Sequence, residues 1–192
     1  MALKKAAKKS VKKSAKKAVK KAAKKGAKHH AGHDLRRAYE HLGRLEVLQG
    51  GLPGAVVTDI NALTQMARTS LQSGDTKNAA DLLRGCEHLA FAALASGSRE
   101  TQIGNDLQEA IDREYEHMVE RAVERWDEQD EEPPTAFASI YEKTYAAAEA
   151  AWNKGAFRRA LELARGAEAL SHVRGLSELQ LHDGGSRGRL KR

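Results

Sequence analysis

Thirteen lysines in residues 1–28 form the clearest candidate binding site in the sequence. They recur as pairs every four residues between small side chains, and the segment holds no acidic residue. Ammonium groups at this density bind phosphate polyanions by displacing condensed counterions, so affinity should fall steeply with salt. The segment has no Arg, Asn, Gln or aromatic residue to read or stack on bases. We therefore expect sequence-nonspecific binding of duplex DNA by Lys4, Lys5, Lys8, Lys9, Lys12, Lys13, Lys16, Lys17, Lys20, Lys21, Lys24, Lys25 and Lys28.

This lysine arm (residues 1–28) resembles the lysine- and alanine-rich tails of histone H1 and of bacterial histone H1-like nucleoid proteins. The shared motif is Lys-Lys-x-x with small residues at x. The resemblance implies a nucleoid-associated, DNA-binding role in the cytoplasm. We expect the free arm to be disordered because its charges repel one another, and to become helical when phosphates neutralise them. RNA, polyphosphate and anionic lipid remain alternative ligands.

Two groups of histidines and acids could bind a metal. Glu114-x-x-His117 has the spacing of a ferritin-type ligand pair, but no second such pair occurs in the chain. His29, His30 and His33 surround Gly32 between the arm and the rest of the chain. For the first group we expect an exposed polar face and for the second a flexible hinge, so no metal ligand is predicted.

Two further features could suggest catalysis or nucleotide binding. Cys86 is the only cysteine, which excludes an intrachain disulfide, and it falls on an apolar helical stripe where a core role is expected. The glycine-rich segment 50–54 lacks the Gly-Lys-Ser/Thr ending of a phosphate loop. We find no catalytic set and predict no cofactor, so the chain is not expected to be an enzyme.

Charge is divided unevenly between the arm and the remainder. The arm takes 13 of the 33 basic residues and none of the 26 acidic ones, which leaves 20 basic against 26 acidic residues, a net charge of −6. We expect this acidic body to compete weakly for its own arm. No apolar run is long enough to span a membrane, and no apolar segment follows the basic N-terminus as in a secretory signal. A cytoplasmic protein without a membrane partner is predicted.

The body reads as six helices. Apolar residues recur at helical spacing, and glycine or proline clusters near residues 50–54 and 132–134 break the pattern. The turn at Ser73-Gly74-Asp75 supplies an N-cap from Asp75 or Thr76. The predicted helices are 34–49, 55–73, 76–96, 101–130, 135–154 and 156–174.

Internal similarity indicates a duplicated three-helix unit. Residues 67–89 and 148–170 share eight identities at an offset of 81, and Pro53 and Pro134 obey the same offset. Upstream, residues 35–42 match 111–118 at an offset of 76. The two offsets differ by five, so the second unit has five more residues than the first, gained inside its first helix or lost from the first unit.

The second and third helices of each unit resemble a tetratricopeptide (TPR) hairpin. The family's small residues and turn glycine fall here on Ala67, Gly74, Ala79 and Cys86, then on Ala148, Gly155, Ala160 and Ala167. The resemblance implies protein–protein contact or self-association. The alternative is that the two units simply pack on one another in one closed core.

Together these patterns predict an all-α protein with a basic N-terminal arm. The predicted divisions are an arm and hinge (1–33), a first three-helix unit (34–100), a second (101–181) and a basic C-terminal tail (182–192) that could add a polyanion contact. The predicted function is nonspecific DNA binding by the arm, with the body mediating self-association or recruiting a protein partner. The alternative is a TPR-like adaptor whose arm binds RNA or an acidic partner.

Overall fold

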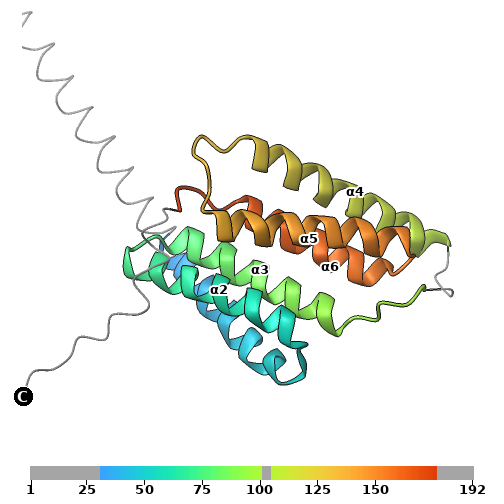
Figure 1. The fold of residues 1–192 in the computed structure, drawn as a ribbon, viewed down its shortest axis with the longest axis horizontal. Helices are drawn as coiled ribbons and strands as arrows, with labels where there is room; N and C mark the ends of the chain where they lie inside the picture. The colour runs from blue at the N-terminus through green and yellow to red at the C-terminus, as the bar shows by residue number, and fades with distance from the viewer. Residues whose placement is uncertain (1–30, 101–104, 177–192) are drawn as a thin grey trace, which may run out of the picture.

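The computed structural model describes residues 31–100 and 105–176, and within these ranges every regular element is a helix (Figure 1). The all-α prediction is therefore confirmed. The first helix covers residues 31–48 and leads into a short 3-10 turn. The later elements are η1 (Gln49–Gly51), α2 (Gly54–Gln72), α3 (Thr76–Leu94), α4 (Asn105–Asp127), α5 (Thr135–Asn153) and α6 (Phe157–Ser171).

Prolines precede α2 and α5, and glycines follow them, so these residues set the boundaries of both helices. Pro53 and Pro134 are the N-caps of α2 and α5, and both of these helices begin and end at an offset of 81 residues. Gly74 and Gly155 follow them with φ of 82° and 74°, a left-handed conformation that glycine adopts without steric cost. Asp75 caps α3 by accepting a 3.1 Å hydrogen bond from the Asn78 backbone N–H. This confirms the predicted N-cap.

The first helix extends further toward the arm than the sequence analysis expected. Gly32 and His33 were placed in a flexible hinge, whereas both lie in the 31–48 helix. In these first turns Asp34 lies 3.9 Å from Arg37 and 3.8 Å from His33. A negative side chain in the first turn also favours a helix by interacting with its macrodipole. His29 and His30 lie outside the described residues.

The body consists of two three-helix halves joined along one seam. In the first half (residues 31–100), α2 packs on α3, and the 31–48 helix buries Ala38 and Leu45 in the same core. In the second half (residues 105–176), α4 and α5 both pack on α6. The halves meet where α3 packs on α6, so the two units pack on one another.

Two glycines allow the close approach of α3 and α6. A Cβ atom added at Gly85 would lie 2.7 Å from Leu170 Cδ2, and one at Gly166 would lie 3.8 Å from the Gly85 carbonyl oxygen. A bulkier residue at Gly85 would therefore push the helices apart. These two glycines are related by the 81-residue offset.

The structure revises the correspondence between the first helices of the two halves. Buried Ala38 and Leu45 are matched by buried Tyr115 and Ala122 of α4, an offset of 77 rather than the 76 read from residues 35–42. The sequence match gave weight to polar residues of the surface, whereas the register of a helix is set by the side chains that it buries. The two halves thus differ by four residues between these helices and the next, not five. The common origin of the halves and the TPR resemblance stay predictions.

Aromatic packing is confined to the second half among the described residues. Tyr115 stacks on Trp152 with ring centroids 4.0 Å apart, and Trp126 stacks on Tyr141 at 3.7 Å. The Tyr141 hydroxyl donates a 3.0 Å hydrogen bond to the Ala122 carbonyl. These contacts fix α4 against α5, and burial raises the pKa of Tyr115 to about 12.

Candidate functional site

The predicted polyanion-binding lysines all lie outside the described residues. This holds for each of the thirteen lysines between Lys4 and Lys28, and for the basic tail after residue 176. What the structure provides is the body to which the arm is joined.

The points where the arm and the tail join the body lie at the same end of the molecule. Arg37, near the start of the first helix, and His172, just after α6, both act electrostatically on Asp81 of α3. Burial raises the pKa of Asp81, and the nearby cations oppose the shift only in part. Its nearest ion-pair partner is Lys77, 3.6 Å away. Arg174 closes this end through hydrogen bonds to Asn78, with Asn78 Nδ2 2.6 Å from the Arg174 carbonyl oxygen.

Cys86 lies where the sequence analysis expected it. Its side chain is fully buried, and the thiol donates a long contact of 3.8 Å to the Ile60 carbonyl. Burial raises the pKa of the thiol to about 12, so it is not a thiolate at neutral pH. Cys86 therefore packs the core of the first half.

Glu114 and His117 are not brought together with further ligands. Glu114 accepts a hydrogen bond from Arg165 Nε at 3.1 Å, while His117 is exposed. In the described ranges no group of three or more metal-ligating side chains forms. The glycine-rich segment 50–54 forms η1 and the start of α2, with no nearby atom around Gly50 or Gly54.

The seam between the halves carries a buried carboxylate that the sequence analysis did not single out. Glu168 is 1% exposed and contacts Arg84 at 3.0 Å, Arg121 at 2.8 Å and His172 at 2.9 Å. Burial opposes its ionisation, but the hydrogen bond from His172 and the two guanidinium charges outweigh this and hold its pKa at about 2. Glu168 thus links α6 to both α3 and α4.

Glu87 occupies the equivalent position in α3 at an offset of 81. It accepts from His41 and lies 2.9 Å from Arg44, both of the first helix. Arg44 and Arg121 are equivalent at the revised offset of 77. Both carboxylates form ion pairs with arginines of neighbouring helices. We therefore assign them a role in helix packing and register rather than in substrate binding.

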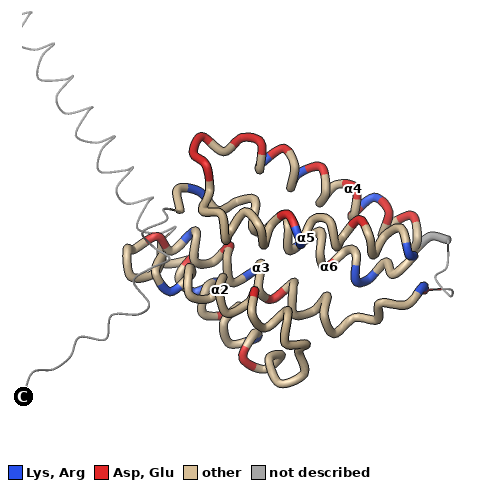
Figure 2. Tube along the Cα trace, in the orientation of Figure 1, with Lys and Arg blue, Asp and Glu red and all other residues tan. Residues whose placement is uncertain are grey.

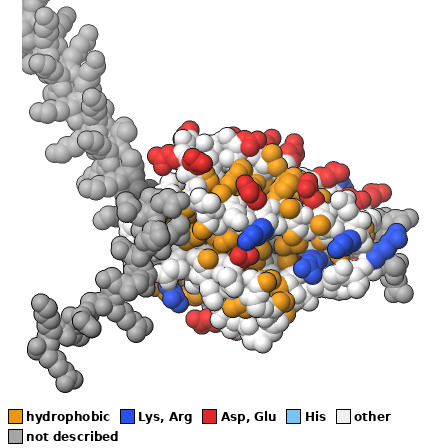
Figure 3. Space-filling view, in the orientation of Figure 1, with side chains coloured by type: hydrophobic (Ala, Val, Ile, Leu, Met, Phe, Trp, Pro, Cys, Tyr) orange, Lys and Arg blue, Asp and Glu red, His pale blue; other side chains and the backbone are white. Residues whose placement is uncertain are grey.

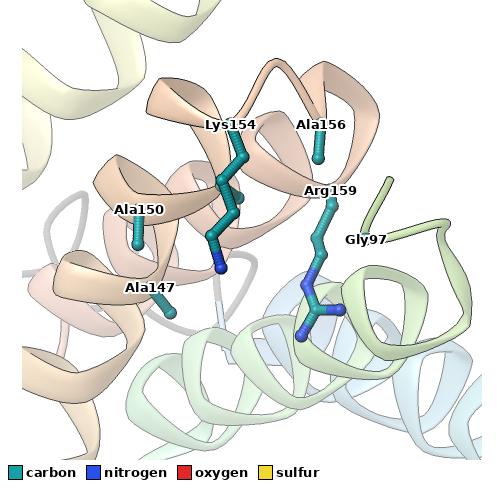
Figure 4. Close-up of a pocket in the computed structure, with 7 residues that line it drawn as sticks. Gly97, Ala147, Ala150, Lys154, Ala156 and Arg159 are labelled. Atoms are coloured by element: carbon teal, nitrogen blue, oxygen red, sulfur yellow. The ribbon is translucent and has the colours of Figure 1, made fainter. Parts of the chain in front are cut away.

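A basic pocket lies at the opposite end of α6, beside the turn from α5. Its cavity volume is about 260 Å³, and its lining combines small residues with two cations. Figure 4 shows Lys154 and Arg159 side by side, with both side chains extending in the same direction. The lining consists of Gly97, Ala147, Ala150, Ala151, Lys154, Ala156 and Arg159.

The pocket is assembled from both halves, which explains why the sequence analysis missed it. The segment after α3 crosses to the α5–α6 turn, where the Glu100 backbone N–H donates a 2.9 Å hydrogen bond to the Gly155 carbonyl. Gly97 then lies against Arg159, whose Nη1 would be 3.0 Å from an added Cβ. The cations on either side of Gly155 are visible in the sequence, but only the fold brings Gly97 beside Arg159.

Acidic residues dominate another surface, the outer side of α4 and the loop after it (Figure 2). Residues 109–132 contain eleven acidic residues and three arginines. Exposed members include Glu116, Glu120 and Glu124. In Figure 3 these acids follow the α4 edge, and basic side chains gather near the α5–α6 turn. The surface of the body therefore separates into an acidic edge and a small basic end.

A second hollow, shallower and with a volume of about 360 Å³, is bounded by Phe91, Ala95, Arg158, Leu161 and Glu162. Phe91 is 38% exposed, and Glu162 is already paired with His88 at 2.8 Å. This hollow offers little charge for recognition. None of the helices in the described ranges has the length and apolar character needed to cross a membrane.

Comparison of the chain with protein-family models, with curated proteins and with solved structures found no match in any of the three.

Proposed function

We propose that this protein binds duplex DNA without sequence preference through its lysine arm, as a nucleoid-associated protein of the cytoplasm. The observation that carries the proposal is the thirteen lysines and the absence of acidic residues in residues 1–28. A polycation of this density gains free energy by releasing counterions from the phosphate lattice. It has no side chain suited to reading base edges, so it would follow the backbone.

The charge of the body supports a division of labour. Outside the arm the chain carries a net charge of −6, and the α4 edge is strongly acidic. Such a surface repels phosphates at distances within the Debye length, about 8 Å at physiological salt. Attraction to a long polyanion therefore depends on the arm.

The body would contribute self-association or recruitment of a protein partner. Two apolar residues of the 31–48 helix are exposed to solvent: the aromatic Tyr39 is 62% exposed and Val47 is 84% exposed. This favours the second candidate function as well, an adaptor whose helical body binds a protein while the arm binds RNA or an acidic partner. The two functions differ in the ligand of the arm.

Replacing all thirteen arm lysines by glutamine tests the proposal while leaving the body intact. In a gel shift with a duplex of random sequence, we expect the variant to lose retardation. A matched control with all thirteen lysines changed to arginine keeps the charge and should retain binding. Equal retardation by the glutamine variant and the unchanged protein would refute the role of the arm.

The salt dependence and a competition experiment sharpen the assignment. If about ten lysines engage phosphates, the slope of log K against log salt is about −9, and affinity falls roughly 10⁵-fold between 50 and 200 mM salt. Complexes that survive unchanged in half-molar salt would contradict this mechanism. Competing the duplex with structured RNA of equal phosphate concentration then distinguishes nonspecific DNA binding from the adaptor function.

A further inference from the structure

The pocket at the α5–α6 turn contains cations without a described partner. Lys154 is exposed and Arg159 half-buried, and neither forms an ion pair or hydrogen bond with any residue that the structure describes. Among residues 101–106, whose side chains the structure does not describe, Asp106 is the one acidic residue. A half-buried guanidinium has lost part of its water and usually recovers the loss by pairing with an anion.

The preceding residue in the chain, Arg158, is an arginine with an acidic partner at the same turn. Arg158 lies 3.7 Å from the Glu100 carboxylate, which also accepts a 3.1 Å hydrogen bond from the Arg158 backbone N–H. Glu100 is therefore an anion already held at the N-terminus of α6, where the helix dipole favours negative charge. Arg158 at this end is thus neutralised, whereas Lys154 and Arg159 line the pocket without a described partner.

The equivalent position in the other half confirms that an unpaired cation is not required by the fold. Asn78 stands where Arg159 would be at the 81-residue offset, and its amide is bonded to Asp75 and to the Arg174 main chain. That turn is closed by hydrogen bonds. The α5–α6 turn is closed by hydrogen bonds to Glu100 and, in addition, has two cations that line a cavity.

We propose that this pocket binds a phosphate group, held between Lys154 and Arg159. Two cations balance a phosphate dianion, the planar guanidinium can donate two parallel hydrogen bonds to it, and the ammonium adds a point charge. A cavity of about 260 Å³ has room for more than one small anion. The alanine floor, formed by Ala147, Ala150 and Ala151, suits an uncharged part of the same ligand, as in a phosphate ester.

The ester can come from a small phosphorylated molecule or from a nucleic-acid backbone. The pocket lies at the N-terminal end of α6, whereas the arm joins the body near its C-terminal end, a separation of about 22 Å for 15 residues. A backbone phosphate bound here would make the body a second contact with the polyanion. The phosphate site itself does not depend on the proposed function of the arm.

The test uses the full chain, labelled with ¹⁵N and titrated with inorganic phosphate, with sodium chloride at matched ionic strength as the reference. We expect saturable shifts of the backbone amides of Gly97, Gly155 and Ala156 in phosphate only. The K154Q/R159Q variant should weaken phosphate binding at these amides about tenfold or more. The control R158Q, outside the pocket, should change it less than twofold. K154Q alone, at an exposed position, guards against a folding defect in the double variant.

Binding of a random duplex to the same full-length proteins identifies the source of the phosphate. If a backbone phosphate occupies the pocket, K154Q/R159Q reduces the salt slope by about two. An unchanged slope together with the phosphate-specific shifts assigns the pocket to a small phosphorylated ligand. The inference is overturned if the three amides respond equally to phosphate and chloride, or if the double variant binds phosphate as the unchanged protein does. Neither result bears on DNA binding by the arm.

Discussion

The two hairpin turns of the body, α2–α3 and α5–α6, have similar backbone conformations but differ in the side-chain contacts that close them. Both follow a 19-residue helix and have a glycine with positive φ, and each is covered by a segment from the other half. At α2–α3, the covering segment exchanges hydrogen bonds with Asn78. At α5–α6, Glu100 of the covering segment bonds to Gly155 and Arg158, while Arg159 has no described partner and lies beside a cavity. The same scaffold thus provides one turn suited to stability and one suited to binding.

The largest expected difference between the halves lies in their buried carboxylates. We expect Glu168→Gln to lower the free energy of unfolding by about 3 kcal/mol, because Arg84 and Arg121 lose the charge that compensates their partial burial. Glu87→Gln should cost about 1 kcal/mol, because the Arg44 side chain is 54% exposed and can be solvated. Urea unfolding measures both, and equal losses would contradict this ranking.

The lowered pKa of Glu168 predicts that part of the stability of the protein is lost at acidic pH. The pKa of Glu168 is lowered from 4.5 to about 2 in the folded chain, so its contribution is complete above pH 4.5 and is lost as the pH falls toward 2. The difference in unfolding free energy between the unchanged protein and Glu168→Gln should shrink over this interval. A difference that stays constant from pH 6 to pH 2.5 would show that the charge does not matter.

Substitutions at the equivalent positions Asn78 and Arg159 of the two turns should give the next largest difference in stability. Asn78→Ala should cost about 2 kcal/mol, because the Arg174 N–H and carbonyl lose their partners at a nearly buried site. Arg159→Ala, at the equivalent position, should change stability by less than about 0.5 kcal/mol. Thermal denaturation of the two variants compares them directly. A large loss for Arg159→Ala would mean that this arginine has a structural role.

The stability losses caused by alanine at the turn glycines, Gly74 and Gly155, should differ by a smaller amount. Gly74→Ala places a side chain in the left-handed region with no atom nearby, at a cost of about 1 kcal/mol. Gly155→Ala carries the same strain and also meets Arg99 Cγ at 3.0 Å, so we expect a loss of up to about 2 kcal/mol. Chemical denaturation should rank the two, and the reverse order would argue that Arg99 moves away freely.

Alanine substitutions at the two seam glycines should change stability in opposite directions. Gly85→Ala gains helix propensity, but its Cβ would lie 2.7 Å from the buried Leu170, for a net loss of about 1 kcal/mol. Gly166→Ala meets only ordinary contacts at 3.6 Å and should stabilise by up to about 1 kcal/mol. Melting temperatures that shift in the same direction for both variants would contradict the asymmetry of the seam.

Local signals made most of the secondary structure predictable. The prolines before α2 and α5 and the glycines after them set boundaries that lie within one residue of those predicted. The hinge at Gly32 and His33 was predicted from composition, but the helix continues through it, because a single glycine only weakens a helix. The 76-residue offset was off by one because similar polar residues recur along a helix surface.

The candidate pocket could not be predicted for a different reason. Lys154 and Arg159 are close in sequence, yet their lack of partners depends on which segment crosses the turn, and this depends on the packing of α3 on α6. Glu87 and Glu168 are one of the eight identities between residues 67–89 and 148–170, but their burial depends on the packing of neighbouring helices. Charge patterns along a sequence do not reveal which charges will be compensated through tertiary contacts.

The stacked aromatic pairs also determine what spectroscopy will detect in this molecule. Both tryptophans of the chain, Trp126 and Trp152, belong to the second half, and each lies parallel to a tyrosine ring. Tryptophan fluorescence therefore follows the second half alone, whereas far-ultraviolet circular dichroism averages over all the helices. Coincidence of the two signals during denaturation would indicate that the halves melt as a single cooperative unit.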